Sequence, residues 1–458
     1  MFKRLGSMLL LALIMCLMSC NRQKNEDEHD FRVAPLEGGE SLEIIRYLGD
    51  KQGVNIPSRL HGKPVTKIGD GTFSGKELIS VTIPKGITII GDNAFGGNLL
   101  TSISIPNSVI SIGNNAFGRN LLMNVAIPNS VTAIGAGAFA ENKIIRLTIG
   151  NNVTEIGDRA FYKNQLTNVT IPRRVAAIGA EAFMENELVS ITFPNSLTSI
   201  GDRAFHKNKL ASVIIPSSIT AFGTEVFWEN QLTSVTIQNN VTTIGDWAFR
   251  DNQLTAFSIP ASVTTIGTGA FYNNMITNVI IPGTVTSIGP MVFTENPLST
   301  FSVSPDNTVY TSGDLFLLNK SGNQLISYYG TERNLIIPAG ITIIGDRAVS
   351  RSQLTSVTIP DTVTAIESGA FSANQLTNVI IPNSVRRIGA GAFSGNTLNS
   401  FTIGANVELE SGAIDRTFED RYSRATNRFD FTTGSGFGRA AGTYVRQQYW
   451  YGTNWVRQ

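Results

Sequence analysis

Cysteine and histidine, the side chains best suited to metal binding and nucleophilic catalysis, are scarce in this sequence. The 458 residues include two cysteines, Cys16 and Cys20, and three histidines, His29, His61 and His206. Because both cysteines lie within the first twenty residues, the body of the chain has no thiol nucleophile, cysteine metal site or disulfide framework. Neither His61 nor His206 has a second histidine nearby in sequence, and His29 lies in a charged segment expected to be flexible. We therefore expect no metal, no cofactor and no catalytic residue.

One stretch matches the dinucleotide-binding fingerprint, but the match is false. Residues 135–140, GAGAFA, fit the pattern G-x-G-x-x-A. A similar stretch recurs at Gly267 and Gly389 with no long helix after it, so it marks a corner of a repeat. The aspartates that could form an acid/base pair share one repeat position and are interpreted as solvated corners: Asp158, Asp202 and Asp246. These observations indicate that the protein is not an enzyme.

The composition excludes further classes of protein. Charged residues make up 16% of the chain, against about 25% in an ordinary globular protein. The formal charge of +1 lacks the basic excess that displaces counterions from phosphates, so no nucleic-acid partner is expected. A hydrophobic content of 42% is enough for a core and too high for a disordered chain. By length alone the chain would form roughly three domains, a division that the repeat described below replaces.

The N-terminus has the features of an export signal with a lipid attachment site. Lys3 and Arg4 precede an apolar run over residues 9–18, which is too short to span a bilayer as a helix. The run ends in LMSC at residues 17–20, which resembles the bacterial lipobox, whose cysteine is acylated and becomes the new N-terminus. We expect Cys20 to carry lipid and anchor the protein to a membrane. The alternative is an ordinary signal peptide with an incidental cysteine.

A repeat of 22 residues organises the rest of the chain. Phenylalanine recurs at this spacing without a slip at Phe73, Phe95, Phe117, Phe139, Phe161, Phe183, Phe205, Phe227, Phe249, Phe271 and Phe293. A period between about 20 and 50 residues is typical of a solenoid, in which stacked units share one core. We therefore expect one elongated solenoid in place of three globular domains.

One copy of the repeat illustrates the role of each position. Residues 235–237 (VTI) alternate with period two, which predicts a short strand that pairs in parallel with the same segment of adjacent coils. In most copies a proline follows and ends the ladder. Gly245 is predicted to turn a corner with a positive φ angle. Asn252, three residues after Phe249, is predicted to satisfy backbone groups of the turn and to stack from coil to coil.

The pattern L-x-x-V-x-I-P-x-x-V-x-x-I-G-x-x-A-F resembles the BspA-like, Treponema-type leucine-rich repeats over nearly the whole mature chain. Asparagine stands where many members of that family carry cysteine, and the period of 22 residues is slightly short. The resemblance implies a right-handed, curved, β-rich solenoid, with short parallel strands stacked in a concave sheet and turns or short helical segments on the convex side. It also implies a bacterial surface lipoprotein that attaches to host or bacterial macromolecules, including fibronectin and fibrinogen for some members.

Breaks in the period divide the chain into expected segments. Turn signals after residue 294 separate strand-like runs at Leu315–Leu318 and Leu325–Tyr329, which predicts a β-hairpin inside an enlarged coil. The expected segments are a signal peptide (1–19), a lipid-anchored flexible tether (20–40), an N-terminal capping repeat (41–77), regular repeats (78–293), the irregular coil (294–336), resumed repeats (337–403) and a C-terminal cap or tail (404–458).

The C-terminal segment combines several tyrosines and tryptophans with the arginines Arg416, Arg421, Arg424, Arg428, Arg439, Arg446 and Arg457. Arginine interleaved with aromatic residues can stack on single-stranded nucleic acid. In an exported protein we favour a cap over the last coil, because an uncapped solenoid exposes its core and a strand edge.

Two stripes of surface residues are free to vary from coil to coil. The outward residue of the predicted strand is mostly Thr or Ser, which gives a concave face of low charge. The residue after each phenylalanine forms the second stripe, which becomes large and rich in binding hot-spot types in the middle of the chain. We call these large residues, together with Trp247 one turn away, the ridge: Tyr162, Met184, His206, Trp228, Trp247, Arg250 and Tyr272. It is interpreted either as a protein-binding surface or as aromatic packing over neighbouring coils.

These observations favour a non-enzymatic, monomeric platform for proteins on a bacterial surface. We expect an exported chain, lipid-anchored to the outer membrane, that acts as an adhesin for host-cell surface, extracellular-matrix or bacterial macromolecules. The alternative is a periplasm-facing structural lipoprotein of the envelope that has no host ligand.

Overall fold

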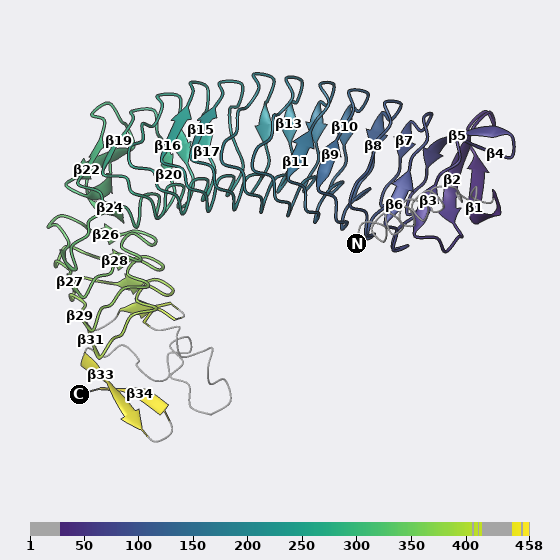
Figure 1. Ribbon diagram of the computed structural model, residues 1–458. Coiled ribbons are helices and arrows are strands. Elements are labelled where there is room, and N and C mark those ends of the chain that lie inside the picture. The colour runs from purple at the N-terminus through teal and green to yellow at the C-terminus, as the bar shows by residue number, and fades with distance from the viewer. Residues whose placement is uncertain (1–27, 405–406, 411, 415–441, 450–451, 458) are drawn as a thin grey trace, which may run out of the picture. The chain divides into compact units, whose positions relative to one another are not determined.

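The computed structural model describes residues 28–404, 407–410, 412–414, 442–449 and 452–457 (Figure 1). Cys20, the predicted signal peptide and the first part of the predicted tether lie outside these residues. The chain divides into two compact units, Met1–Val153 and Thr154–Gln458. Each is a stack of coils with short parallel strands, and together they contain about 17 coils, which confirms the predicted solenoid.

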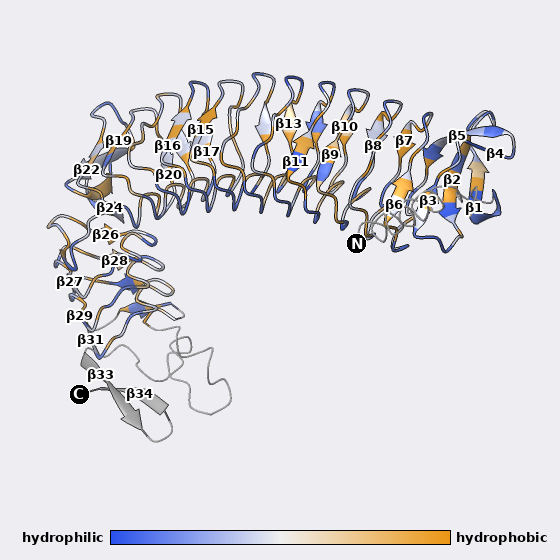
Figure 2. Ribbon diagram, in the orientation of Figure 1, coloured by the Kyte–Doolittle hydropathy of each residue, from blue (hydrophilic) through white to orange (hydrophobic). Residues whose placement is uncertain are grey.

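Many coils contribute strands to two rows, where the sequence predicted one. The first strand row consists of the Val-x-Ile segments, as expected. The second strand row consists of the two residues before the recurrent corner glycine, and it is the more continuous of the two. Figure 2 shows the result, with apolar strand segments alternating with hydrophilic turns. The alternation follows from burying one side of each short strand while the turns face water.

In the N-terminal unit both rows pair in parallel. The first row pairs β3 (Gly53–Asn55) with β6 (Ser80–Thr82), and β9 (Asn124–Ala126) with β11 (Arg146–Thr148). The second row runs through β5 (Lys63–Ile68), β7 (Ile89–Ile90), β8 (Ser111–Ile112) and β10 (Ala133–Ile134). β4 (Arg59–Leu60) pairs antiparallel with β5. The register advances by one repeat at each regular coil, so that Ile90 lies opposite Ile112.

The C-terminal unit has the same two rows. Its first row contains the pairs β15 (Ser212–Ile215) with β16 (Ser234–Ile237), β19 (Asn278–Ile281) with β21 (Thr300–Val303), β25 (Asn334–Ile336) with β27 (Ser356–Thr358), and β29 (Asn378–Ile380) with β31 (Ser400–Ile403). Its second row contains β12 (Glu155–Ile156), β13 (Ala177–Ile178) and β14 (Ser199–Ile200); β17 (Thr243–Ile244), β18 (Thr265–Ile266) and β20 (Ser287–Ile288); and β26 (Ile343–Ile344), β28 (Ala365–Ile366), β30 (Arg387–Ile388) and β32 (Glu408–Leu409).

Part of the predicted tether is folded, which corrects its boundary at residue 40. A 3-10 helix, η1 (Glu28–Asp30), leads into β1 (Phe31–Pro35), which pairs antiparallel with β2 (Leu42–Tyr47). The cause is an apolar anchor that follows the charged stretch, because Phe31 is buried with its ring 5.5 Å from that of Tyr47. β2 then pairs in parallel with β5 and starts the second row.

The irregular coil contains the expected hairpin. β23 (Phe316–Asn319) and β24 (Gln324–Tyr328) pair antiparallel, within one residue of the predicted runs. A further strand, β22 (Tyr310–Gly313), pairs antiparallel with β23 and was not expected. β24 continues in parallel to β26, so the second row resumes directly after the insertion.

A terminal hairpin lies on the last strand of the first row. β33 (Gly442–Tyr449) pairs antiparallel with β31 and with β34 (Gly452–Arg457). These backbone hydrogen bonds cover the edge of β31 that stacking of a further coil would otherwise occupy. The arginine and aromatic side chains of this tail lie outside the part that the structure describes.

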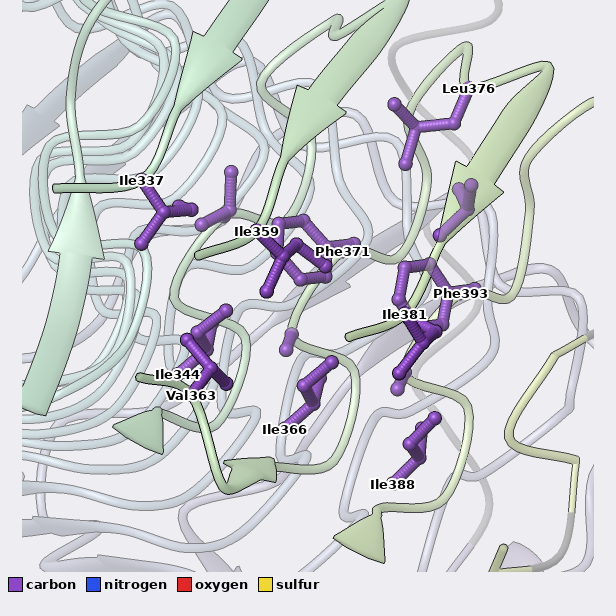
Figure 3. Close-up of a cluster of buried hydrophobic side chains, with 14 of the residues drawn as sticks. Ile337, Ile344, Ile359, Val363, Ile366, Phe371, Leu376, Ile381, Ile388 and Phe393 are labelled. Atoms are coloured by element: carbon purple, nitrogen blue, oxygen red, sulfur yellow. The ribbon is translucent and has the colours of Figure 1, made fainter. Parts of the chain in front are cut away.

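The phenylalanines form stacked columns in the core. In the N-terminal unit the rings of Phe95 and Phe117 lie 5.3 Å apart and 7° from parallel. Figure 3 shows the same arrangement near the other end, where Phe371 and Phe393 stack at 5.2 Å beside Ile359 and Ile381. Offset stacking of this kind adds to the free energy gained by burying the rings.

The predicted asparagine ladder is present. Asn98 Nδ2 donates to the carbonyl oxygens of Phe73 and Phe95, at 2.8 Å each. Its Oδ1 accepts the N–H of Leu78 at 3.0 Å. One buried amide therefore satisfies backbone groups of its own coil and of the preceding coil, which explains why the position tolerates so little variation.

The predicted positive φ angle at the corner glycine is wrong. Gly245 does not lie in the left-handed region. The equivalent Gly135 shows the real constraint, because a Cβ atom there would lie 2.5 Å from the carbonyl carbon of Gly113 in the preceding coil. Left-handed residues occur instead two positions later, as at Trp247 with φ 55°. Close approach of two backbones, rather than conformational freedom, selects glycine at the corner.

Turns, not helices, occupy the side of the coils away from the strand rows. Among the described residues the 3-10 helix η1 is the one helical element. The same part of the chain contains no helix whose length and hydropathy suit a membrane span.

Candidate functional site

All seven ridge residues lie in the C-terminal unit, in turns next to the buried phenylalanines. The asparagine ladder fixes these turns. Asn252 Nδ2 donates to the carbonyl oxygens of Phe227 and Phe249 at 2.9 and 3.1 Å, and its Oδ1 accepts the N–H of Leu232 at 3.0 Å. Because each coil repeats this arrangement, the residue after the phenylalanine emerges at the same place in every coil. Side chains at that position therefore form a column.

Arg250 is the centre of a cluster of aromatic rings. Its guanidinium carbon lies 4.7 Å from the ring centroid of Trp228, 5.0 Å from that of Trp247 and 5.3 Å from that of Tyr272. A cation over an aromatic face is attracted by the ring quadrupole, by about 0.5–2 kcal/mol depending on exposure. Arg250, Trp228 and Trp247 are each half-buried. The structure thus brings together residues from three successive coils.

Asp251 ties this cluster together, and the sequence analysis missed it. Its Oδ2 accepts hydrogen bonds from Trp228 Nε1 at 2.8 Å and Arg250 Nε at 3.1 Å, and its Oδ1 accepts one from Asn273 Nδ2 at 2.8 Å. The carboxylate neutralises the guanidinium and fixes the indole orientation. A sequence signal existed, because the two residues before it in the same column, Lys207 and Glu229, are also charged.

His206 supports Trp228 from the preceding coil. The two rings lie 4.4 Å apart, and His206 is buried, with 3% of its surface exposed. His206 Nδ1 lies 3.0 Å from the carbonyl oxygen of Trp228, so in the neutral ring it is Nδ1 that carries the hydrogen. Burial lowers the pKa of His206, and the hydrogen bond to Trp228 opposes this only in part. The imidazole is therefore a neutral packing group.

Tyr272 and Trp247 pack along the column instead of projecting from it. Tyr272 is 5% exposed, and its hydroxyl donates to the Glu295 carboxylate. Burial, followed by this hydrogen bond, raises the pKa of Tyr272 to about 12. The Trp247 ring meets Tyr272 edge to face at 5.8 Å and lies over Gly269, where a Cβ atom would collide with it. Gly269 therefore makes room for Trp247.

The first two ridge residues stand apart from the cluster. Tyr162 is half-buried with the Lys163 amino group 5.1 Å from its ring centroid, and Met184 is half-buried on the next coil. The described contacts connect neither side chain to Arg250. The structure thus joins the other five ridge residues through ring and cation contacts: His206, Trp228, Trp247, Arg250 and Tyr272.

A ladder of charges precedes Trp247 along the chain, two residues after four of the corner glycines: Gly157, Gly179, Gly201 and Gly223. Arg159 Nε lies 2.7 Å from Glu181 Oε2, Arg203 Nη1 lies 3.9 Å from Glu181 Oε1, and Arg203 also pairs with Glu225. The hydrogen bond from Arg159 lowers the pKa of Glu181 and raises that of Arg159. Because the signs alternate, this stripe presents little net charge to a partner.

The recurring aspartates are exposed, as expected, but they also have a structural role. Asp158 Oδ1 accepts the N–H of Ala180 at 2.7 Å, and Asp202 Oδ1 accepts that of Thr224 at 2.7 Å. Each carboxylate thus caps a backbone group of the following coil. In the part of the chain that the structure describes, no cluster of three His, Cys, Asp or Glu residues could hold a metal ion.

The face of the first strand row is low in charge and contains exposed isoleucines among Thr and Ser. In the C-terminal unit these are Ile214, Ile280, Ile336 and Ile380, each more than half exposed. They occupy the outward strand position that is Thr or Ser in most coils. Exposed apolar side chains among hydroxyl groups give this face the character of a contact surface.

Comparison with known proteins agrees with the repeat. A family model described as BspA type leucine-rich repeat region, in 6 copies, matches residues 66–187, 176–300 and 327–417. No curated protein matches the sequence.

Solved structures of bacterial leucine-rich repeat proteins are also similar. A leucine-rich repeat protein from Eubacterium ventriosum is 26% identical, covers 51% of this chain and 62% of its own, less than two thirds, with a TM-score of 0.44. A leucine-rich cell surface protein from Faecalibacterium prausnitzii is 23% identical over 86% of this chain and 87% of its own, with a TM-score of 0.41. A leucine-rich repeat protein from Bacteroides ovatus is 22% identical over 81% and 92%, with a TM-score of 0.44.

Proposed function

Because the chain belongs to the family of BspA-type leucine-rich repeat proteins, we propose that it is a cell-surface adhesin that binds a protein partner through the Arg250 cluster. We define this cluster as Trp228, Trp247, Arg250, Tyr272 and Asp251. The repeat fold is a scaffold for protein interaction. The finer assignment, to adhesion and to this cluster, is our proposal.

The observation that carries the proposal is the half-exposed pair of tryptophans held around Arg250. Trp and Arg are the residue types most enriched among binding hot spots. Hydrogen bonds to Asp251 and packing on His206 and Tyr272 hold the rings in place before a partner arrives. Pre-ordered side chains lose little conformational entropy on binding, which raises affinity.

The ridge residues divide into three roles on this proposal. Trp228, Trp247 and Arg250 contact the partner, since their side chains retain exposed surface. His206 and Tyr272 are buried and position the contact residues. Tyr162 and Met184 lie at the rim, where contacts exclude water and contribute less to the binding free energy.

We assign the protein to the outer membrane of a bacterial cell, exported and anchored through lipid on Cys20. Extracellular-matrix, host-cell surface or bacterial proteins are the proposed partners. Protease treatment of intact cells tests this location. Cleavage of the repeats on intact cells is expected, whereas protection until the outer membrane is permeabilised would favour the periplasmic scaffold. Cys20→Ser is expected to abolish acyl labelling and release the protein from the membrane, and continued membrane retention would contradict the anchor.

Binding assays on purified protein test the cluster. We would immobilise fibronectin, fibrinogen and proteins from bacterial surface extracts, and measure binding of the Cys20→Ser chain. Trp228→Ala with Trp247→Ala is expected to weaken binding at least about tenfold, the loss typical of hot-spot residues. Met184→Ala, in the same column but away from the cluster, is the matched control and is expected to bind like the parent. Equal binding by the double variant would show that these rings serve packing alone.

A further inference from the structure

The N-terminal unit exposes apolar side chains in its turns, away from the ridge residues. They occupy two repeat positions: the residue after the ladder asparagine, and the residue before the first-row strand. Four of them are well exposed, and the fifth, Leu121, is half-buried. We call these five residues the turn patch: Ile79 (52% exposed), Leu99 (43%), Leu121, Met123 (47%) and Ile145 (39%).

Backbone hydrogen bonds between successive coils make the turn patch continuous. The N–H of Leu121 donates to the carbonyl of Leu100 at 2.9 Å, and the N–H of Ile145 donates to that of Met123 at 2.9 Å. Adjacent coils are therefore about 4.8 Å apart at these positions. At that spacing Leu99 lies beside Leu121 and Met123 beside Ile145, while Thr101 separates Ile79 from Met123, so the patch is a largely apolar surface with one threonine in it.

The fold does not require apolar residues at these positions. The inward neighbours Leu100, Leu122 and Ile144 are fully buried and already supply the core. In the C-terminal unit the same two positions are mostly polar: Gln165, Lys209, Gln231 and Gln253 after the asparagine, and Thr167, Thr233, Thr255 and Thr277 before the strand. An apolar surface that the scaffold does not need is typical of an interaction site.

Two cations lie at one end of the turn patch without acidic partners. Several other cations of the turns pair with carboxylates one coil away, as Lys209 does with Glu187 at 3.0 Å and Arg119 with Glu141 at 3.1 Å. Lys143 and Arg146 have no such partner among the described residues, and both are exposed. At the opposite end Lys76 and Glu77 carry opposite charges and offset each other. The patch is therefore apolar with a net positive end.

We propose that the turn patch docks a protein segment that presents apolar side chains next to carboxylates. The apolar side chains of that segment would cover Leu99, Met123 and Ile145, and its Asp or Glu residues would pair with Lys143 and Arg146. Burial of the patch supplies affinity, and the charge pairs set the orientation of the segment. This inference extends the proposed protein-binding function to a second surface, which belongs to the other unit of the chain.

Variants copied from the chain's own repeats test the patch without disturbing the fold. Leu99→Gln, Met123→Thr and Ile145→Thr together install residues that other coils already carry at these positions. Lys143→Glu with Arg146→Glu reverses the charge at the positive end. The matched control is Trp228→Ala with Trp247→Ala, which alters the Arg250 cluster alone. Thermal unfolding followed by circular dichroism verifies that each variant is folded.

The probe is a displayed library of random 12-residue peptides, selected on the full-length Cys20→Ser chain and counter-selected on the triple patch variant. Selected peptides are expected to combine aliphatic or aromatic residues with Asp or Glu. They are expected to bind the charge-reversed variant at least about tenfold more weakly, and the Trp228/Trp247 control without loss. Unchanged peptide binding by the Trp228/Trp247 control separates the two surfaces. It tests the turn patch whether or not the Arg250 cluster binds a partner of its own.

Two results would overturn the proposal. One is that the selected peptides are basic or uncharged, or that no selected peptide binds the parent chain better than the triple variant. The other is binding to a membrane in place of a protein. The lipid alternative holds if the parent chain sediments with phosphatidylglycerol vesicles, the triple variant does not, and no peptide is selected. The patch would then bind an anionic lipid surface.

Discussion

The same repeat position carries different chemistry in the two units. After each buried phenylalanine, the regular coils of the N-terminal unit have a small residue, Gly96, Gly118 or Ala140. In the C-terminal unit the position is large from Tyr162 to Tyr272. At the two turn positions of the turn patch the preference is reversed, since most residues there are apolar in the N-terminal unit and polar in the C-terminal unit, with Val189 and Met275 as apolar exceptions. Each unit thus has its own enriched surface.

The backbone beneath these surfaces is alike. The N–H of Gly97 donates to the carbonyl of Gly118 at 2.9 Å, and the N–H of Lys207 donates to that of Trp228 at 3.0 Å. Both bonds join the residue two after a phenylalanine to the next coil. The comparison teaches that core stacking and surface chemistry are separable, because each coil repeats one interior and varies a few outward columns. The predictions below challenge this separation, beginning with the largest effect.

Removing a core ring is expected to cost the same in either unit. Phe117→Ala and Phe205→Ala each remove a fully buried ring that stacks on both sides, at 5.3 Å in the first case and at 5.5 and 5.8 Å in the second. The expected loss is about 3–5 kcal/mol of unfolding free energy, measured by urea denaturation. A much smaller loss in one unit would show that the interiors are not equivalent.

Replacing Gly269 by Ala is expected to cost more unfolding free energy than the same replacement at another left-handed glycine, because the Trp247 ring packs on Gly269. Gly269 and Gly391 occupy the same repeat position with φ of 56° and 63°. A Cβ atom would collide with the Trp247 ring at Gly269, but at Gly391 it would meet the Ser394 side chain, with Oγ nearest at 3.3 Å. Gly391→Ala is expected to cost about 1 kcal/mol from backbone strain. Gly269→Ala is expected to cost about 1–3 kcal/mol more, from overpacking.

A double-mutant cycle with Trp247→Ala checks the origin of this extra cost. In the Trp247→Ala background, Gly269→Ala is expected to cost no more than Gly391→Ala does in the parent, because the colliding ring is gone. If Gly269→Ala still carries the extra cost in the Trp247→Ala background, the strain comes from the backbone. The evidence that the Trp247 ring lies along the column would then be lost.

Burial of His206 is expected to make the C-terminal unit sensitive to mild acid. The folded-state pKa lies below the ordinary value of 6.5 because of burial. The unfolded chain therefore binds more protons than the folded chain as the pH falls through about 6.5, and stability decreases. His206→Gln is expected to reduce this decrease between about pH 7 and pH 5, where carboxylates with pKa values near 4 remain ionised.

The control for this experiment is His61→Gln in the N-terminal unit. His61 is exposed and lies outside the core, so its replacement controls for the loss of an imidazole as such. Thermal unfolding midpoints measured across the pH range decide the question. Equal slopes for the parent and His206→Gln would mean that the imidazole is hydrated in the folded state.

Most of the interior could be predicted from the sequence, because each interior role depends on one residue type at a fixed interval. The stacked phenylalanines and the asparagine ladder belong to this class, whereas the hairpin strands of the irregular coil were predicted from turn residues at a break in the period. Gly245 shows the limit of such reasoning. A recurring glycine is explained equally well by a positive φ angle or by a close approach of two backbones, and the distance between coils decides between them.

The candidate site was only partly predictable for a related reason. The repeat places Trp228, Arg250 and Tyr272 in one column, but it does not determine whether their side chains project outward or lie along the column. That choice depends on contacts one coil away, such as Asp251 with the Trp228 indole and Gly269 beneath Trp247. The strand β1 was missed because it is short, directly follows a charged stretch and has one buried side chain, Phe31.

The smallest expected effect concerns the surface ion pairs, where the units differ in degree. Arg159 and Glu181 pair at 2.7 Å with side-chain exposures of 61% and 16%, and Arg203 approaches the same carboxylate. In the N-terminal unit Arg119 and Glu141 pair at 3.1 Å with exposures of 76% and 41%. Glu181→Gln is expected to cost up to about 1 kcal/mol and Glu141→Gln less, because exposed pairs contribute little.

Salt and pH show whether the difference is electrostatic. The cost of Glu181→Gln is expected to shrink between low salt and about 1 M NaCl, where the Debye length falls to about 3 Å. Because Arg159 lowers the pKa of Glu181, the ion pair stabilises the folded chain above the ordinary carboxylate pKa and ceases to do so as the pH falls through the lowered value. Equal, salt-independent costs for both variants would mean that Arg203, the second arginine near Glu181, adds nothing to the unfolding free energy. The charge ladder would then be a neutral feature of the surface.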